Sequence, residues 1–317
     1  MGNRAFAPVV IACAAYTLSY LAIAGGNVYG WALFTGVPAF IGFATTAILA
    51  LLRPHTFRGS FWYSAGAGLL VATIFIVTRA EGLICLLMFL PLALPMIALG
   101  TALAWVLFHR NRLARAGSAA AMSFVLLAAA IACEPALHRS RVPVYAAADS
   151  IVIDGTPGEV WSAIVGLSDV PKPDDLFFRT GIATPQKTKI VTCATGGLRV
   201  CTMSTGTLLE RIDVWQPGVR LGWRALSTPP PMKELNPFGD ADPPHLHGTY
   251  RNVRGEFALE RVDAHRTRVT RRTWYEHDLY PSGYWRIWCD LGASKIHHLV
   301  LEHLRRETEK RRGGMQV

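Results

Sequence analysis

The sequence predicts two structural parts: an α-helical transmembrane bundle, followed by an α+β domain whose curved antiparallel sheet surrounds a long C-terminal helix. The bundle is indicated by long apolar runs that fill the first ~135 residues. The domain is indicated by about six strand-like segments between residues 188 and 277, and by a helical apolar pattern over residues 282–310.

The two parts differ in charge. Residues 1–148 hold nine Arg, no Lys and two acids, whereas residues 149–317 hold 23 basic and 20 acidic residues. The net charge of +10 and the pI of 9.6 therefore arise mainly from short loops beside apolar segments. Nucleic-acid binding would need a basic face, which the mixed charges of the second part do not offer. We therefore expect no nucleic-acid partner.

Five apolar runs divide the first part. Most have the ~20 residues that a helix needs to cross ~30 Å of hydrocarbon, while the fifth is shorter and rich in Ala. The runs cover 7–24, 31–52, 61–78, 83–108 and 119–133. We expect a transmembrane region over 1–135, a linker over 136–148 and a folded domain over 149–317. No acid lies inside the runs, which favours an anchor over a transporter.

The arrangement of Arg residues predicts the orientation of the bundle. Basic residues collect in cytoplasmic loops. With the N-terminus inside, the inner segments hold Arg4, Arg53, Arg58, Arg110, Arg112 and Arg115, and the outer loops hold only Arg79. Five crossings of the plasma (cytoplasmic) membrane then place the domain outside the cytoplasm. If the fifth run does not cross, the domain is cytoplasmic.

The first run also has features of a secretory signal. Arg4 precedes it, and Ala22-Ile23-Ala24 resembles a cleavage site. Its apolar stretch is longer than the usual ~7–15 residues, which favours an uncleaved anchor.

The second part opens with a strand over 150–154 and then a helix. Thr156-Pro157-Gly158-Glu159 has the pattern of a capping box with Pro at the first helical position. A short helix is expected near 174–180. Strands are expected over 188–194, 198–203, 208–215, 219–227, 254–261 and 267–277, and a Pro-rich loop over 228–249.

The order of these strands and helices is similar to that of a known superfamily. Together with the opening Asp-Gly-Thr-Pro-Gly-Glu-Val-Trp at 154–161 and the strand at 267–270, it resembles the START-like superfamily, also called SRPBCC. The polyketide cyclase/dehydrase and lipid-transport-like branch is the most similar, and the Pro-rich stretch at 227–248 resembles a membrane-linked bacterial subgroup. The resemblance covers about 150–310 and implies a helix-grip fold, which hosts binders, cyclases and hydrolases alike.

Strand alternation selects the face of the sheet that meets the long helix. Residue pattern alone favours a filled core there, whereas the resemblance implies an apolar ligand cavity with Arg271, Thr273 and Tyr275 as polar anchors. The expected lining residues are Ile212, Leu221, Trp223, Phe257, Leu259, Arg271, Thr273 and Tyr275 from the strands, and Trp288, Leu291, Ile296 and Leu299 from the helix.

We therefore expect a membrane-tethered START-like domain that binds a hydrophobic or lipid-like small molecule, with membrane lipids as partners and no cofactor. The Pro-rich loop is expected to cover the cavity as a lid or a membrane contact through Met232, Leu235, Phe238 and Leu246. One alternative is a cyclase- or hydrolase-like enzyme, for which Glu210 is the candidate acid or base. Another is a sensor that signals through the membrane helices.

Two His-containing segments are candidate metal sites. His245 and His247 lie near Asp240 and Asp242, but a Pro-rich loop favours a solvated segment over fixed metal geometry. His298 and Glu302 share a helix face without the spacing of a zinc motif. We therefore expect no metal.

Two cysteines flank one expected turn. Cys193 and Cys201 lie on either side of Thr195-Gly196-Gly197, so they would be cross-strand partners in a hairpin centred on Gly197. An extracytoplasmic location would permit a disulfide between them. The alternative is two unpaired thiols, because a slip of one residue separates the two side chains.

Overall fold

The computed structural model describes residues 2–26, 29–52, 56–108, 113–137, 142–167 and 169–314. Arg53, Arg110 and Arg112, which contribute to the predicted orientation, lie outside the described residues. The chain forms two compact units. The helical unit contains residues 1–141 together with 234–245 and 279–281, and the C-terminal domain contains the remainder.

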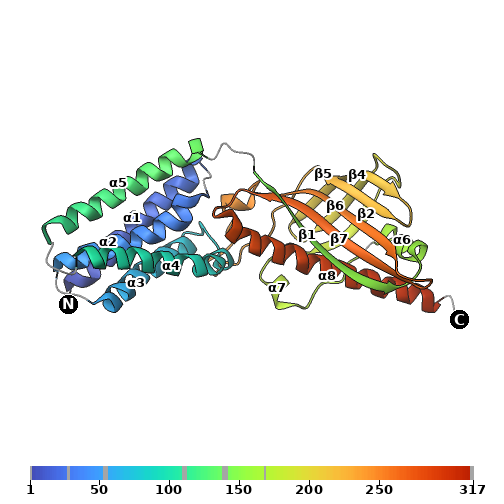
Figure 1. Cartoon of the computed structure of the whole chain (residues 1–317), viewed down its shortest axis with the longest axis horizontal. Coiled ribbons are helices and arrows are strands. Elements are labelled where there is room, and N and C mark those ends of the chain that lie inside the picture. The colour runs from blue at the N-terminus through green and yellow to red at the C-terminus, as the bar shows by residue number, and fades with distance from the viewer. Residues whose placement is uncertain are drawn as a thin grey trace. The chain divides into compact units, whose positions relative to one another are not determined.

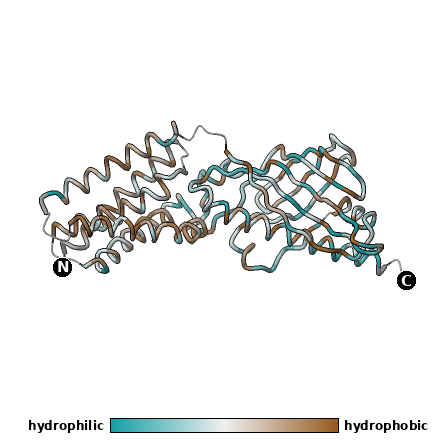
Figure 2. The backbone as a smooth tube through the Cα atoms, in the orientation of Figure 1, coloured by the Kyte–Doolittle hydropathy of each residue, from teal (hydrophilic) through white to brown (hydrophobic). Residues whose placement is uncertain are grey.

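The helical unit is built from the apolar runs. Its elements are α1 (Gly2–Gly26), the π-helical turn η1 (Ala32–Gly36), α2 (Val37–Leu52), α3 (Phe57–Val77), α4 (Leu83–Phe108) and α5 (Leu113–Leu137). Figure 2 shows the long helices as largely hydrophobic along their length. Four of them, over 32–52, 57–77, 83–108 and 115–136, are long and apolar enough to cross a membrane. In α1 the apolar stretch is shorter, at Pro8–Ile23.

Small residues let α2 and α4 approach closely. A side chain at Gly42 would collide with the backbone carbonyl of Ile97, and one at Gly100 would collide with that of Ala39. Close backbone approach through small residues is typical of helices that associate in lipid. A hydrogen bond of 3.2 Å from Thr101 to Ser64 adds a polar contact between α4 and α3.

The fifth helix is tied to the bundle by its acid. The Glu134 carboxylate accepts hydrogen bonds from the backbone N–H groups of Trp31 and Ala32, where the second helical segment begins. These N–H groups have no partner inside their own helix, so a carboxylate there satisfies them and meets the positive end of the helix dipole. Glu134 thus joins the end of α5 to the beginning of the next apolar segment.

The C-terminal domain has the predicted α+β architecture. Its elements are β1 (Val144–Asp154), α6 (Pro157–Val165), α7 (Leu176–Arg179), β2 (Pro185–Ile190), β3 (Leu198–Met203), β4 (Gly206–Gln216), β5 (Arg220–Ala225), β6 (Tyr250–Arg261), β7 (Arg266–His277) and α8 (Ser282–Gly314), with a 3-10 turn, η2 (Pro244–Leu246), in the Pro-rich segment. One antiparallel sheet has the order β1-β7-β6-β5-β4-β3-β2, and α8 runs along it (Figure 1). The predicted fold class is confirmed.

Local signals in the sequence account for the first helix of the domain. The Thr156 side chain accepts from the Glu159 backbone, and the Glu159 carboxylate accepts from the Thr156 backbone at 2.6 Å. This is the predicted capping box. The domain itself begins earlier than expected, because Val144 and the four residues after it already pair with β7. The linker is therefore shorter than the predicted 136–148.

The predicted disulfide is wrong. In the β2–β3 hairpin, Thr188 is the cross-strand partner of Cys201, so the hairpin is not centred on Gly197. Cys193 lies in the turn and is exposed, whereas Cys201 is buried, and both thiols are free. The longer turn shifts the register and separates the two side chains.

The buried face of α8 differs from the expected one by about one residue. Leu291, one of the expected lining residues, is 40% exposed. The buried residues are Trp285, Ala293, His297, Val300, Leu301, Leu304 and Thr308. A small Ala and two polar side chains on this face lower its hydrophobicity, so the apolar pattern points to the neighbouring face.

Candidate functional site

The inner face of the sheet contains the apolar residues that alternation selects. Ile212, Leu221, Trp223, Phe257 and Leu259 form one packed cluster with residues of α6 and α8, and Ile296 packs against it. Tyr275 lies in a separate cluster with Ala147 and Ala293. Its hydroxyl donates to Asp290 at 2.6 Å. The expected lining residues from the strands are thus largely packed against one another.

Charged side chains are buried within this apolar face. Arg199 and Glu210 form a buried ion pair between β3 and β4. The Arg199 guanidinium lies 4.2 Å from the centre of the Trp223 ring, and that of Arg271 lies 4.6 Å from it. Burial, together with the charge of Arg199, lowers the pKa of Arg271 to about 10. Glu210, the candidate acid or base, is buried, but its partner is Arg199, so its carboxylate serves as a structural counter-charge.

A second polar group joins α8 to the edge of the sheet. Thr273 Oγ1 lies 2.8 Å from His297 Nε2, and His297 Nδ1 lies 2.8 Å from an Asp149 carboxylate oxygen. Ser294 donates to the other Asp149 oxygen at 2.8 Å. The hydroxyl–imidazole–carboxylate order is that of a proton relay, but His297 is only 1% exposed. We assign this group to holding α8 against β1 and β7.

The buried imidazole makes the domain sensitive to acid. Burial and the nearby Arg271 lower the pKa of His297 to about 4, from an ordinary value of 6.5. Between these two pH values the unfolded chain binds a proton that the folded domain does not, so stability falls as pH decreases through this window. The loss is about 1.4 kcal/mol per pH unit. Hydrogen exchange of the α8 amides at pH 7.5 and pH 5 should show it.

Two variants test this pH dependence. Between pH 7.5 and pH 5, the α8 amides of the His297→Gln variant should lose less protection from hydrogen exchange than those of the original protein. His265→Gln is the matched control, because His265 is exposed in the turn between β6 and β7, outside the group formed by Asp149, Thr273 and His297. An equal slope in His297→Gln would contradict the assignment.

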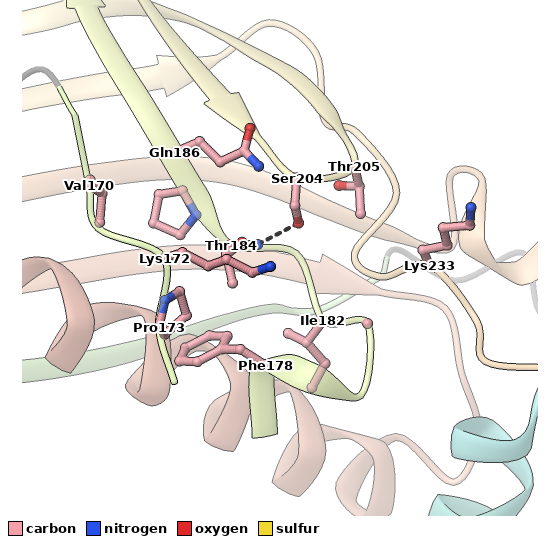
Figure 3. A pocket seen from close by; sticks show the side chains of 12 residues that line it. Val170, Lys172, Pro173, Phe178, Ile182, Thr184, Gln186, Ser204, Thr205 and Lys233 are labelled. Carbon is pink, nitrogen blue, oxygen red and sulfur yellow. Dashed lines mark hydrogen bonds between the residues drawn. The ribbon is translucent and has the colours of Figure 1, made fainter. Parts of the chain in front are cut away.

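One pocket of the domain lies at the β2 edge of the sheet, beside α7. Its volume is about 380 Å³. Figure 3 shows Phe178 and Ile182 on one side of it, Gln186 and Ser204 on the other, and the Lys172 side chain between them. The lining residues are Val170, Lys172, Pro173, Phe178, Gly181, Ile182, Thr184, Pro185, Gln186, Ser204, Thr205 and Lys233. None of the predicted cavity residues is among them.

Backbone pairing fixes the walls of this pocket. Ala183 N–H donates to Pro231 at 2.9 Å, and Lys233 N–H donates to Gly181 at 2.9 Å. Gly181 has a φ of 98°, and a side chain there would collide with the Lys233 carbonyl. Only glycine tolerates this conformation and this close approach. Ser204 accepts from the Thr184 backbone at 2.9 Å, as Figure 3 shows.

The charge and polarity of the lining restrict the ligand. The lining contains two Lys and no Asp or Glu, besides hydroxyl and amide groups and apolar side chains. Lysine ammonium groups favour anions, and the apolar side chains Phe178 and Ile182 favour hydrocarbon or aromatic groups. The lining therefore suits a molecule that is apolar at one end and negatively charged at the other.

The expected lid is divided between the two units. Met232 and Leu246 belong to the C-terminal domain and are buried. Leu235 and Phe238 belong to the segment Glu234–His245, which packs within the helical unit. The segment is thus held by other residues and is not a free flap.

His245 also lies in this segment. Among the described residues, one group of His, Cys and acidic side chains has the spacing of a metal site, and it contains Glu81, Cys85 and His245. Glu81 and Cys85 lie about 160 residues from His245 in the chain, so local sequence spacing could not predict this group.

The sheet order and the C-terminal helix decide the fold of the domain. A strand, two short helices, six further antiparallel strands and a long helix along the sheet form one unbroken series. This is the START-like helix-grip fold. The predicted resemblance of the C-terminal half is confirmed.

Solved structures similar to this chain include two enzymes and a START superfamily protein. The Zhui aromatase/cyclase of a Streptomyces species is 15% identical, with 53% of this chain and 96% of that chain covered and a TM-score of 0.37. Norcoclaurine synthase of Thalictrum flavum is 8% identical, with coverages of 55% and 99% and a TM-score of 0.37. A START superfamily protein of Mycobacterium smegmatis is 7% identical, with coverages of 52% and 97% and a TM-score of 0.35. No family model and no curated protein matches the sequence.

Proposed function

We propose that this chain is a membrane-tethered START-like protein whose C-terminal domain binds a small amphipathic molecule that carries a negative charge. The pocket beside α7 carries this proposal, because its lining combines apolar side chains with the Lys172 side chain and contains no acid. The ligand class retains the hydrophobic molecule expected from the sequence and adds an anionic group.

Tethering follows from the apolar helices. Four helices have the length and composition of membrane spans. We propose that these four helices and the shorter apolar helix α1 cross the cytoplasmic membrane, with the N-terminus inside and the domain outside. Within the helical unit, the segment Glu234–His245 packs with Tyr29 and Glu81, which lie in the first and third interhelical loops. Five crossings place these two loops and the chain after α5 on the same side, which supports the proposed topology.

The enzyme alternative has less support. Glu210 is the candidate acid or base, and its carboxylate is paired with a buried guanidinium. The relay of Thr273, His297 and Asp149 contributes no residue to the lining of the pocket. Binding is therefore the function that these residues favour.

A pair of matched probes tests the proposed ligand class. 8-Anilinonaphthalene-1-sulfonate is anionic, and N-phenyl-1-naphthylamine has nearly the same rings without the charge. Fluorescence titration of the full chain in nanodiscs should show that Lys172→Glu weakens binding of the anionic probe about tenfold, because an attractive charge becomes a repulsive one. Binding of the uncharged probe should change little.

The control is Lys189→Glu. Lys189 lies on β2 outside the pocket, so its charge reversal should leave both probes unaffected. Equal affinities of the original protein and Lys172→Glu for the anionic probe would refute an anion-binding pocket. Equal weakening by both variants would show that only the overall charge matters.

A further inference from the structure

The segment Glu234–His245 is held to the ends of the membrane helices by specific hydrogen bonds. Leu83 N–H donates to the Leu235 carbonyl at 2.8 Å. The Asn236 side-chain amide donates to the carbonyls of Ile76 at 2.8 Å and Glu81 at 3.1 Å. These contacts lie where α3 ends and α4 begins. They hold the segment, which begins with Glu234 and ends with His245, within the helical unit.

Three side chains with metal-binding atoms meet at this place. Cys85 Sγ lies 3.1 Å from His245 Nε2, and His245 Nδ1 lies 3.4 Å from a Glu81 carboxylate oxygen. One ligand atom from each of the three lies within 4.8 Å of the other two. Ligands of a single ion are spaced in this way, since each lies about 2.0–2.3 Å from it.

A further acidic side chain lies beside this group of three. Glu234 lies beside Cys85 and is 3% exposed. Neither of its carboxylate oxygens has a hydrogen-bond partner. Gly82 provides its space, because a side chain at that position would collide with the Glu234 carboxylate. A buried carboxylate without a partner is costly, so its position demands a positive charge nearby.

The protein itself supplies little of that charge. Glu81 is buried, and one of its oxygens also has no hydrogen-bond partner. Among the ion pairs of the described residues, neither Glu81 nor Glu234 pairs with Lys or Arg, and the His245 contact is the one that Glu81 forms. Two buried carboxylates and a thiol around one imidazole would be balanced by a divalent cation.

We propose that Glu81, Cys85, Glu234 and His245 form a binding site for a divalent transition-metal ion of the zinc class. Thiolate, imidazole and carboxylate are the ligands that Zn²⁺ takes in proteins, and four of them satisfy its tetrahedral preference. Magnesium and calcium are disfavoured, because both select oxygen ligands. The ion would join the beginning of α4 to both ends of the segment Glu234–His245.

The site can be tested with purified full chain in detergent, stripped of metal by a chelator and then dialysed against Zn²⁺ or Co²⁺. We expect one Zn²⁺ per chain by elemental analysis. We expect Co²⁺ to give the visible spectrum of a tetrahedral ion with a thiolate ligand. The variants Cys85→Ser, His245→Gln and Glu234→Gln should each weaken the affinity about 100-fold or more, since the loss of even an outer partner costs 10–100-fold.

Matched controls and a test on the unaltered protein make the result decisive. Cys193→Ser and His247→Gln change the same residue types outside the cluster and should bind as the original chain does. If a cluster variant fails to fold, alkylation of the original chain still tests the site: Zn²⁺ should protect Cys85, and not Cys193, from iodoacetamide. Absence of stoichiometric metal, or equal alkylation of Cys85 with and without Zn²⁺, would overturn the proposal.

Discussion

Replacement of Glu210 by Gln is expected to lower the free energy of unfolding of the C-terminal domain by about 3–5 kcal/mol, because removal of one partner of a buried ion pair leaves the other charge buried and unpaired. Here the effect falls on two guanidinium groups, since Arg199 and Arg271 both lie against Trp223. The buried Glu210 carboxylate supplies the negative charge that pairs with Arg199. Gln has nearly the same shape, so the change isolates the charge.

Hydrogen exchange of the β3 and β4 amides in the full chain measures this loss. The matched control is Glu260→Gln, because Glu260 forms an exposed pair with Arg268 on the outer face of the sheet. Exposed pairs contribute ~0–1 kcal/mol, so the control should change exchange little. Similar effects of the two variants would show that the Arg199–Glu210 pair is not buried as described.

The second large effect is expected from Trp223→Ala, at about 3–5 kcal/mol. Trp223 is almost fully buried and packs against Phe257 with a ring-to-ring distance of 5.7 Å. Its ring lies over Gly255, its cross-strand partner on β6, where a side chain would leave no space for it. The change would leave a cavity and would also remove the ring that faces both guanidinium groups.

Trp274→Ala is the control for this change. Trp274 occupies the opposite face of the sheet and is only partly buried. The guanidinium groups of Arg254 and Arg272 lie over its ring. It should cost clearly less than Trp223→Ala when urea unfolding of the domain is followed by proteolysis. An equal or larger loss in Trp274→Ala would contradict the burial pattern of the two faces.

Much of the fold could be predicted because its signals are local. The apolar runs, the capping box at Thr156 and the alternation of strands β4 to β7 each depend on residues close together in the chain. The inner residues of β3 could not be predicted in this way. Arg199 and Cys201 face inward there, while Leu198 is exposed. When a charged side chain is buried because it pairs with an opposite charge on the next strand, the hydrophobicity pattern assigns the wrong face of the strand to the core.

The candidate sites depended on contacts that a linear pattern does not contain. Asp149 and His297 meet across 148 residues, and Cys85 and His245 meet across 160 residues. The pocket is lined by short loops and by residues at strand ends, where side-chain direction follows turn geometry more than alternation. The resemblance indicated a cavity but not its position, because the sheet of this chain is filled by its own aromatic and charged side chains.

The helical unit is built from three separate segments of the chain, which affects how it assembles during synthesis. Residues 234–245 and 279–281 complete this unit, although its last long apolar helix, α5, ends at Leu137. When the ribosome has finished the helices, the ends of α3 and α4 still lack these partners, which are made about a hundred residues later. Glu81 and Cys85 therefore lack their partners from this segment until β1 to β5 have been made. A cut before Val142 would yield an N-terminal fragment that lacks part of the helical unit and a C-terminal fragment that contains all residues of the C-terminal domain.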